Sequence, residues 1–139
     1  MTSIDHLPVS EYAFPGPLRD SLIAAILRGD KTATTSLVVD YELEGEAMPS
    51  VGEHSAIVDS AGDRIAVEQI TEVTIARVGD VDLAHAIAEG EGFETVAEWR
   101  AGHERFWHGV EYRSSVGDPS FTVDDDTLAV LVRFRVVPA

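Results

Sequence analysis

The first strong pattern along the chain is helical and ends at a glycine. Leu18, Leu22 and Ile26 recur at the spacing of one helix face. Pro17, a residue favoured at the first position of a helix, precedes them. Gly29 supplies a C-terminal stop. The pattern therefore predicts a helix that begins at Pro17 and ends at Gly29.

Four later segments have the alternation or the β-branched content of strands. We predict strands over residues 32–39, 54–58, 64–75 and 128–137. The polar, glycine-bearing turn at residues 59–63 joins the second and third of these strands into a hairpin.

Two further helices are predicted between the third and fourth strands. Asp80 is a plausible N-cap for a helix over residues 81–88. Thr95 and Glu98 form a capping-box pattern that begins a second helix, which runs to about His108. Strands with inserted helices predict an α+β fold, with a sheet that could curl into a small barrel.

Composition narrows the class of protein. The 139 residues fit one domain, and we expect residues 1–11 to be an N-terminal tail. The formal net charge is −15, which repels a long phosphate backbone but not a nucleoside. The absence of cysteine excludes disulfides, thiolate zinc sites and a cysteine nucleophile.

The N-terminus lacks the basic and apolar regions of a secretory leader, and no segment has the length of a membrane span. We therefore expect a cytoplasmic protein with no membrane partner. The sequence leaves the oligomeric state and any protein partner open.

The junction between the first helix and the first strand carries candidate chemistry. Lys31 leads directly into the hydroxyl side chains of Thr34, Thr35 and Ser36. A cation beside several potential nucleophiles indicates a catalytic or binding site. Each residue also has a structural interpretation, because threonine favours strands and a lysine after a helix complements the helix dipole.

One face of the helix that begins after Thr95 combines aromatic and charged residues. A helical wheel places Trp99, Arg100, His103 and Trp107 together. A buried guanidinium needs a carboxylate partner or a polar cavity, and Glu91 is the nearest candidate in the sequence. The face is interpreted either as part of a binding site or as core tryptophans beside a structural pair.

No metal or cofactor is expected. The His103-Glu104-x-x-x-His108 segment has one residue too many for a zinc helix, so its histidines lie on different faces. Phosphate-loop and dinucleotide glycine motifs are absent from the sequence.

An ordered set of motifs resembles the ASCH domain family, in particular its longer bacterial branch. The set spans roughly residues 12–137. Its members are Phe14-Pro15-Gly16, Gly29-x-Lys31-Thr32-x-Thr34, Ala33-Thr34-Thr35-Ser36-Leu37, Glu89-Gly90-Glu91-Gly92 and Trp99-Arg100-x-x-His103-x-x-Phe106.

This resemblance implies a single ASCH domain over residues 1–139, with a PUA-like small β-barrel, flanking helices and a cleft that binds a ribonucleoside or a short RNA. Similar members have been assigned as N4-acetylcytidine amidohydrolases or as ribonucleases. Lys31, Thr34 and Glu91 match the lysine, threonine and glutamate of the amidohydrolase signature. Ser36 departs from the short branch, which has an arginine there, so Arg100 could supply the missing positive contact.

Two mechanisms follow from this resemblance. In amide hydrolysis, Thr34 is the nucleophile, Lys31 is the base or the oxyanion stabiliser, and Glu91 shuttles a proton. If the strand is regular from Lys31 onward, Thr35 is the same-face neighbour instead.

In the alternative, the same cleft is an RNA-binding site or that of a single-stranded RNA ribonuclease. Trp99 or Trp107 then stacks a base, and Arg100 and Lys31 hold phosphate or ribose. A ribonuclease could use Lys31 and His103 as its acid and base. The net charge of −15 favours the small substrate.

Overall fold

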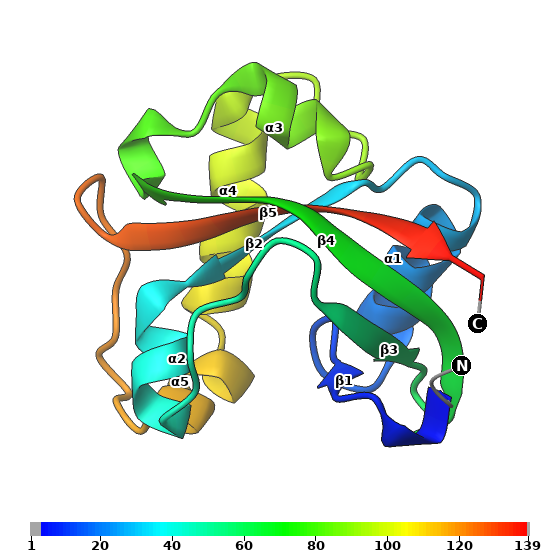
Figure 1. Ribbon diagram of the computed structural model, residues 1–139. Coiled ribbons are helices and arrows are strands. Elements are labelled where there is room, and N and C mark those ends of the chain that lie inside the picture. Colours follow the sequence, from blue (N-terminus) through cyan, green and yellow to red (C-terminus); the bar gives the residue numbers. More distant parts are fainter. Residues whose placement is uncertain (1–3, 139) are drawn as a thin grey trace.

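The computed structural model describes residues 4–138, in which five strands form one mixed sheet (Figure 1). The order of the strands across the sheet is β1, β3, β4, β5, β2. β1 pairs with β3 in parallel, and every other neighbouring pair is antiparallel. The strands are β1 (Val9–Ser10), β2 (Ala33–Leu37), β3 (His54–Val58), β4 (Arg64–Arg77) and β5 (Leu128–Val137).

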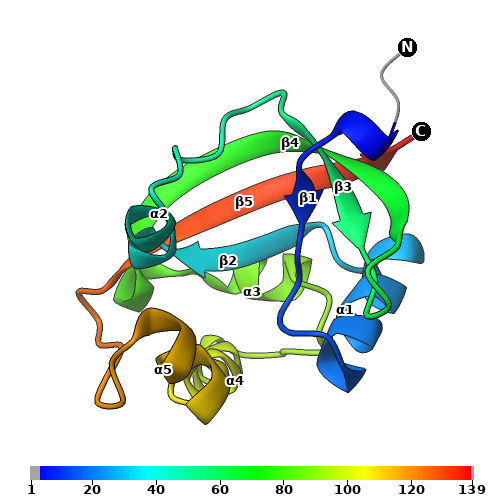
Figure 2. The same ribbon diagram turned by 90° about the horizontal axis from the view of Figure 1, so that it is seen from below.

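The sheet is open, which corrects the expectation of a closed barrel. β1 and β2 are its two edge strands, and within residues 4–138 they do not pair with each other. β1 has only two residues and pairs with β3. Figure 2 shows the curved sheet, with β1 beside β3 and β2 beside β5. The free edge of β2 is therefore available to line a cleft.

Five α-helices and two short 3₁₀ turns complete the described chain. Helices α3, α4 and α5 lie on one side of β2, and α1 lies beside β1 and β3 (Figure 2). The helices and turns are η1 (Ile4–His6), α1 (Pro17–Leu27), α2 (Val38–Glu44), η2 (Val78–Asp80), α3 (Leu83–Ala88), α4 (Val96–Trp107) and α5 (Val110–Val116). None of the helices within residues 4–138 has the length and apolar character needed to cross a membrane.

Several predicted elements are confirmed. The strands at residues 54–58 and 128–137 have the predicted bounds, and α1 begins at Pro17. Helix α4 begins after the capping box of Thr95 and Glu98, in which each side chain accepts a backbone N–H of the other residue. β4 continues two residues beyond the predicted end, to Arg77.

Other expectations were wrong in their bounds. The strand predicted over residues 32–39 stops at Leu37, because the Asp40 carboxylate accepts the Leu37 N–H and α2 begins there. The helix predicted after Asp80 is instead capped by Asp82, whose side chain accepts the N–H of His85.

The expected tail at residues 1–11 is partly ordered. It contains η1 and β1 within its described part, whereas residues 1–3 lie outside the described residues. Helix α5 was not predicted at all.

The apolar core is divided between two clusters. The larger cluster packs α3, α4 and α5 against β2 and β5 around the buried rings of Trp99 and Trp107. The smaller cluster joins α1 to the sheet through Ile23, Ile26 and Phe134. Because Lys31 follows α1 and precedes β2, the chain places it between the two clusters.

A close backbone contact fixes the turn between α3 and α4 against the segment before β2. Gly90 has a φ of +67°, and a Cβ there would lie 2.3 Å from the Asp30 carbonyl oxygen. The Thr32 N–H donates to the Ala88 carbonyl at 2.8 Å beside this contact. Only glycine permits both the left-handed backbone and this approach.

We expect Gly90→Ala to destabilise the fold strongly, because the new Cβ forces the two backbone segments apart. Gly92→Ala is the matched control, since Gly92 also has a positive φ but nothing within 4 Å of its Cβ position. The control should cost about 1 kcal/mol, and Gly90→Ala at least twice that amount. Chemical denaturation measures both, and equal losses would contradict the proposed role of the contact.

Candidate functional site

The centre of the site is the ammonium of Lys31, which is almost completely buried. Its side chain is 1% exposed. Nζ donates to the Ala33 carbonyl at 2.9 Å and to the Glu89 carbonyl at 3.3 Å. It also lies 6.0 Å from the centroid of the Tyr12 ring, within the range of a cation–π contact.

Two carboxylates from the turn after α3 face this ammonium. Nζ of Lys31 lies 3.7 Å from Oε1 of Glu89 and 3.5 Å from Oε2 of Glu91. The Glu89 side chain is 1% exposed and that of Glu91 is 22% exposed. A buried ammonium is costly without such partners. Lys31 and Glu91, which are both predicted site residues, thus form a direct ion pair.

Glu89 is the most densely bonded group of the site. Its carboxylate accepts hydrogen bonds from Thr35 Oγ1 at 3.1 Å, from His103 Nε2 at 3.1 Å and from the indole nitrogen of Trp99. Burial raises the pKa of this carboxyl, but the hydrogen bond and charge of His103 and the charge of Lys31 outweigh it. The resulting pKa is about 2. Glu89 is therefore an anion at neutral pH that anchors the site.

His103 is held with both ring nitrogens facing acceptors. Nδ1 lies 3.0 Å from the Trp99 carbonyl and Nε2 faces Glu89. The ring is also stacked on Trp99, with centroids 4.5 Å apart. The arrangement thus fixes the imidazole ring between the Trp99 carbonyl and the Glu89 carboxylate.

Thr35 joins β2 to this network. Its hydroxyl donates to Glu89, which leaves Nε2 of His85 as the donor to Thr35 Oγ1 at 2.7 Å. Burial lowers the pKa of His85, while the Glu89 charge acts in the opposite sense. Thr35 and His85 therefore support the anchoring carboxylate.

An open cleft of about 1850 Å³ lies in front of Lys31. The β1–α1 segment forms one wall, α4 and α5 form the other, and the free edge of β2 lies between them. The predicted residues in its lining are Lys31, Thr34, Thr35, Ser36, Glu91, His103 and Trp107. Thr34 lies opposite Val132 in the β2–β5 register, and both line the cleft.

A further carboxylate, that of the buried Glu68, feels the charge of Lys31. Glu68 of β4 lines the cleft and accepts a hydrogen bond from the Tyr12 hydroxyl at 2.5 Å. Burial raises the pKa of Glu68, and its hydrogen bonds together with the charge of Lys31 act against that rise. Burial also raises the pKa of Glu91, where Lys31 opposes the shift and the neighbouring Glu89 reinforces it.

Carboxylates predominate over the whole cleft. Beyond those near Lys31, the lining includes Glu11, Glu44, Glu46, Glu53 and Glu111. Its Lys and Arg side chains are Lys31, Arg19, Arg28 and Arg105. The guanidinium of Arg19 is itself engaged by the carbonyls of Tyr12, Ala13 and Asp59. The negative charge of the cleft therefore repels a chain of phosphates.

Arg100 and Trp99 lie outside the lining of the cleft. Arg100 bonds Glu104 at 2.6 Å and Asp125 at 2.8 Å. These two carboxylates take the place of Glu91, the partner expected from the sequence. Trp99 has no exposed surface and packs in the core. Trp107 lines the cleft but is only 2% exposed.

Three ligand-type atoms of the site lie close enough together to hold a metal ion. One atom each from Glu89, Glu91 and His103 lies within 4.8 Å of the others. Lys31 already places a positive charge between the two carboxylates. A divalent ion would therefore have to displace the ammonium or tolerate its repulsion.

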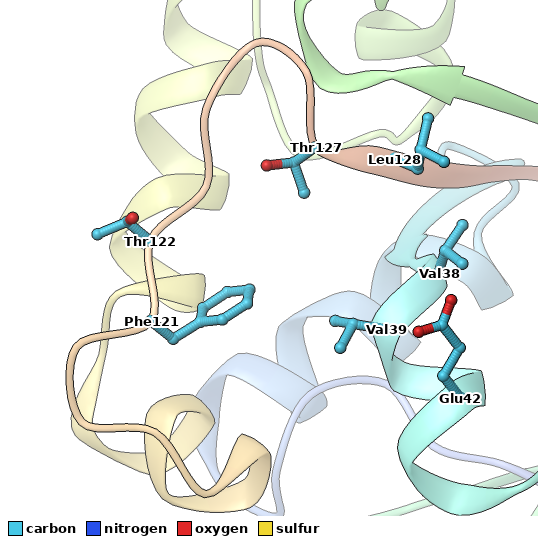
Figure 3. A pocket seen from close by; sticks show the side chains of 7 residues that line it. All are labelled: Val38, Val39, Glu42, Phe121, Thr122, Thr127 and Leu128. Carbon is cyan, nitrogen blue, oxygen red and sulfur yellow. The ribbon is translucent and has the colours of Figure 1, made fainter.

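A second pocket of about 260 Å³ lies away from this cleft, between α2 and the segment that leads into β5. Phe121 and Val39 point toward one another across it (Figure 3). Of the residues that line this pocket, only Glu42 has a titratable side chain, and Glu42 is exposed.

Sequence reasoning missed Glu89 and His85. The four-residue spacing of His85 and Glu89 on one helix face, and of Trp99 and His103 on the next helix, was a usable signal. Glu91 drew attention instead because glycines flank it on both sides. The same glycine turn brings both glutamates to Lys31.

The fold and the cleft define an α+β domain with an open mixed sheet and a buried lysine–glutamate cluster at the edge of β2. The family model for the ASCH domain matches residues 10–138. The chain therefore belongs to the ASCH domain family.

Solved structures agree with this assignment. The ASCH domain from Lactobacillus crispatus JV V101 is 30% identical, with a TM-score of 0.75 over 93% of this chain and 79% of that one. Protein EF3133 from Enterococcus faecalis V583 is 27% identical, with a TM-score of 0.80 over 94% of this chain and 76% of that one.

A more distant structure shares the fold alone. A tyrosine-to-phenylalanine mutant of ZmASCH from Zymomonas mobilis is 13% identical, with a TM-score of 0.51 over 91% of this chain and 67% of that one. No curated protein matches the chain.

Glu89 should make the stability of the protein pH-dependent. Its pKa falls from the ordinary 4.5 to about 2 on folding, so its ionised form stabilises the fold above about pH 4.5. That contribution is lost as the pH falls toward 2. We expect Glu89→Gln to cost roughly 3 kcal/mol at pH 7, and the difference from wild type to shrink in acid. Thermal unfolding between pH 7 and pH 2 measures this.

Glu91→Gln is the matched control, because its pKa shift has the opposite sign. A raised pKa makes the folded state bind its proton more tightly, so this group contributes stability in acid and loses it as the pH rises through the raised pKa. The Glu91→Gln protein should therefore gain stability relative to wild type as the pH rises. The same trend in both variants would contradict the assigned charge states.

Proposed function

We propose that this protein hydrolyses the amide of a small, uncharged modified ribonucleoside such as N4-acetylcytidine. The observation that carries the proposal is the buried ammonium of Lys31 paired with Glu91 at 3.5 Å, in a cleft that Thr34 also lines. A cation, a carboxylate and a hydroxyl around one cavity are the groups that acyl transfer requires.

Lys31 acts as the stabiliser of the oxyanion. Its neighbours are two carbonyl oxygens, which accept hydrogen bonds from Nζ, and two carboxylates of opposite charge. A fixed positive charge shielded from water stabilises the negative charge that develops on the amide oxygen. This arrangement supports the electrostatic role over that of a general base.

Thr34 is the nucleophile of the proposal. Its Oγ attacks the acyl carbon while its proton passes to Glu91. The C–N bond then breaks as the leaving amine nitrogen takes that proton from Glu91. Water hydrolyses the resulting threonine ester, which releases the carboxylic acid and restores the hydroxyl. Thr35 is the weaker candidate, because its hydroxyl proton is already donated to Glu89.

Glu91 suits the shuttle role because burial and the neighbouring Glu89 charge raise its pKa, although Lys31 opposes the rise. A carboxylate with a raised pKa takes and returns a proton more readily near neutral pH. Its partial exposure also allows a substrate to reach it.

RNA binding or cleavage is the competing function for this fold. The acidic lining argues against it, since a bound strand would bring phosphates toward Glu11, Glu44, Glu46 and Glu53. Arg100, which could have held a phosphate, is engaged by Glu104 and Asp125. The charges of the cleft thus favour a neutral nucleoside.

The test is incubation of the purified protein with N4-acetylcytidine and, separately, with a short single-stranded RNA, each with and without EDTA. We expect deacetylation that survives the chelator. Lys31→Ala, Thr34→Val and Glu91→Gln should each lower kcat/KM by at least about a hundredfold, as removal of oxyanion or acid–base groups does.

Arg77→Gln is the control, because Arg77 is exposed at the end of β4 and pairs with Asp126 and Asp80 outside the cleft. Cleavage of the RNA without deacetylation would reject the proposal. A binding affinity for RNA that falls steeply with salt would identify phosphate contacts and favour the competing function.

A further inference from the structure

β2 is an edge strand, and the direction of its backbone groups follows from one hydrogen bond. The Phe134 N–H donates to the Thr32 carbonyl at 3.1 Å, and Ala33 lies opposite Arg133. Alternation in an antiparallel ladder then directs the backbone groups of Thr34 and Ser36 toward β5. Those of Ala33, Thr35 and Leu37 point away from the sheet.

The outward positions on either side of Thr35 are engaged inside the protein. The Ala33 carbonyl accepts Nζ of Lys31, and the Leu37 N–H donates to the Asp40 carboxylate. Within residues 4–138, neither the N–H nor the C=O of Thr35 has a hydrogen-bond partner. Thr35 is half-buried and lines the cleft. Thr35 therefore offers one backbone donor and one backbone acceptor side by side on the free edge.

We infer that the backbone of Thr35 recognises the hydrogen-bonding edge of the substrate's base. A ring nitrogen acceptor next to an amino N–H, as on the Watson–Crick edge of cytosine, matches the N–H and C=O of this residue. The inference rests on the proposed function and defines its substrate class as a neutral base with adjacent acceptor and donor atoms.

The geometry favours a single base over an extended peptide. An added strand gains its affinity from a row of outward backbone groups. Here the Ala33 carbonyl and the Leu37 N–H are already bonded. A peptide could therefore pair with the N–H and C=O of Thr35 but could not form a continuous ladder. An uncharged backbone pair also suits an acidic cleft, because it recognises a ligand without needing a phosphate.

The interaction can be tested from both sides by binding calorimetry, in a cycle that varies the ligand and the protein. Cytidine offers the ring acceptor at N3, and 3-deazacytidine replaces it with C–H. We expect the wild-type protein to bind cytidine at least about tenfold more tightly, because the analogue leaves the Thr35 N–H unpaired. N4,N4-dimethylcytidine, which lacks the amino hydrogen, should lose a similar factor.

Thr35→Pro removes the N–H without breaking the ladder to β5, since proline is tolerated where an edge N–H faces outward. Thr35→Val is its matched control, because it also lacks the hydroxyl but keeps the N–H. The preference for cytidine over 3-deazacytidine should persist in Thr35→Val and vanish in Thr35→Pro. If Thr35→Pro does not fold, the relative affinity of the wild-type protein for cytidine and 3-deazacytidine still tests the inference.

The outcomes separate this inference from the proposed function. Equal affinity of the wild-type protein for cytidine and 3-deazacytidine overturns the inference, whatever the hydrolysis assay shows. A clear preference for cytidine without any deacetylation supports the inference and rejects the hydrolysis. Failure of every nucleoside to bind, or tight binding of an extended peptide in their place, overturns the inference as well.

Discussion

The structure depends on a single electrostatic requirement, the neutralisation of a lysine ammonium that has been taken out of water. Lys31 cannot be buried at the edge of β2 unless carboxylates and carbonyls surround it, because the desolvation of an isolated cation costs several kcal/mol. Glu89 and Glu91 meet that requirement from a turn almost sixty positions further along the chain. Gly90 lets this turn approach so closely. Helices α3 and α4, which flank the turn, are thereby positioned relative to the sheet.

Much of the fold could be predicted from local sequence patterns, because the interactions that form these elements are between residues close together in the sequence. The capping box of Thr95 and Glu98 and the short strand over residues 54–58 depend on residues close together in the sequence, and both predictions are confirmed. The early end of β2 depends instead on the Asp40 side chain turning back onto the Leu37 N–H. Such a switch from strand to helix overrides the strand preference of neighbouring valines.

The site was predictable only in part for a related reason. Lys31 and Glu91 stand out in the sequence because glycines flank or precede them, whereas Glu89 and His85 look like ordinary residues of a short helix. Their importance arises from the packing of α3 against β2 and α4, a contact between segments far apart in the sequence. Arg100 shows the converse error, since a helical wheel gives the direction of a side chain but not how far it extends or which carboxylate it meets.

The openness of the sheet connects this electrostatic centre to the outside. A closed barrel would have paired β2 with another strand and covered the backbone of Thr35, together with the face on which Thr34 lies. Because β1 and β2 do not pair within residues 4–138, the edge of β2 stays open and the cleft forms along it. The buried charges then lie at the inner end of an accessible surface. The acidity of the walls has the same consequence as the open edge, since both favour a small neutral molecule that is recognised by backbone groups rather than by ion pairs.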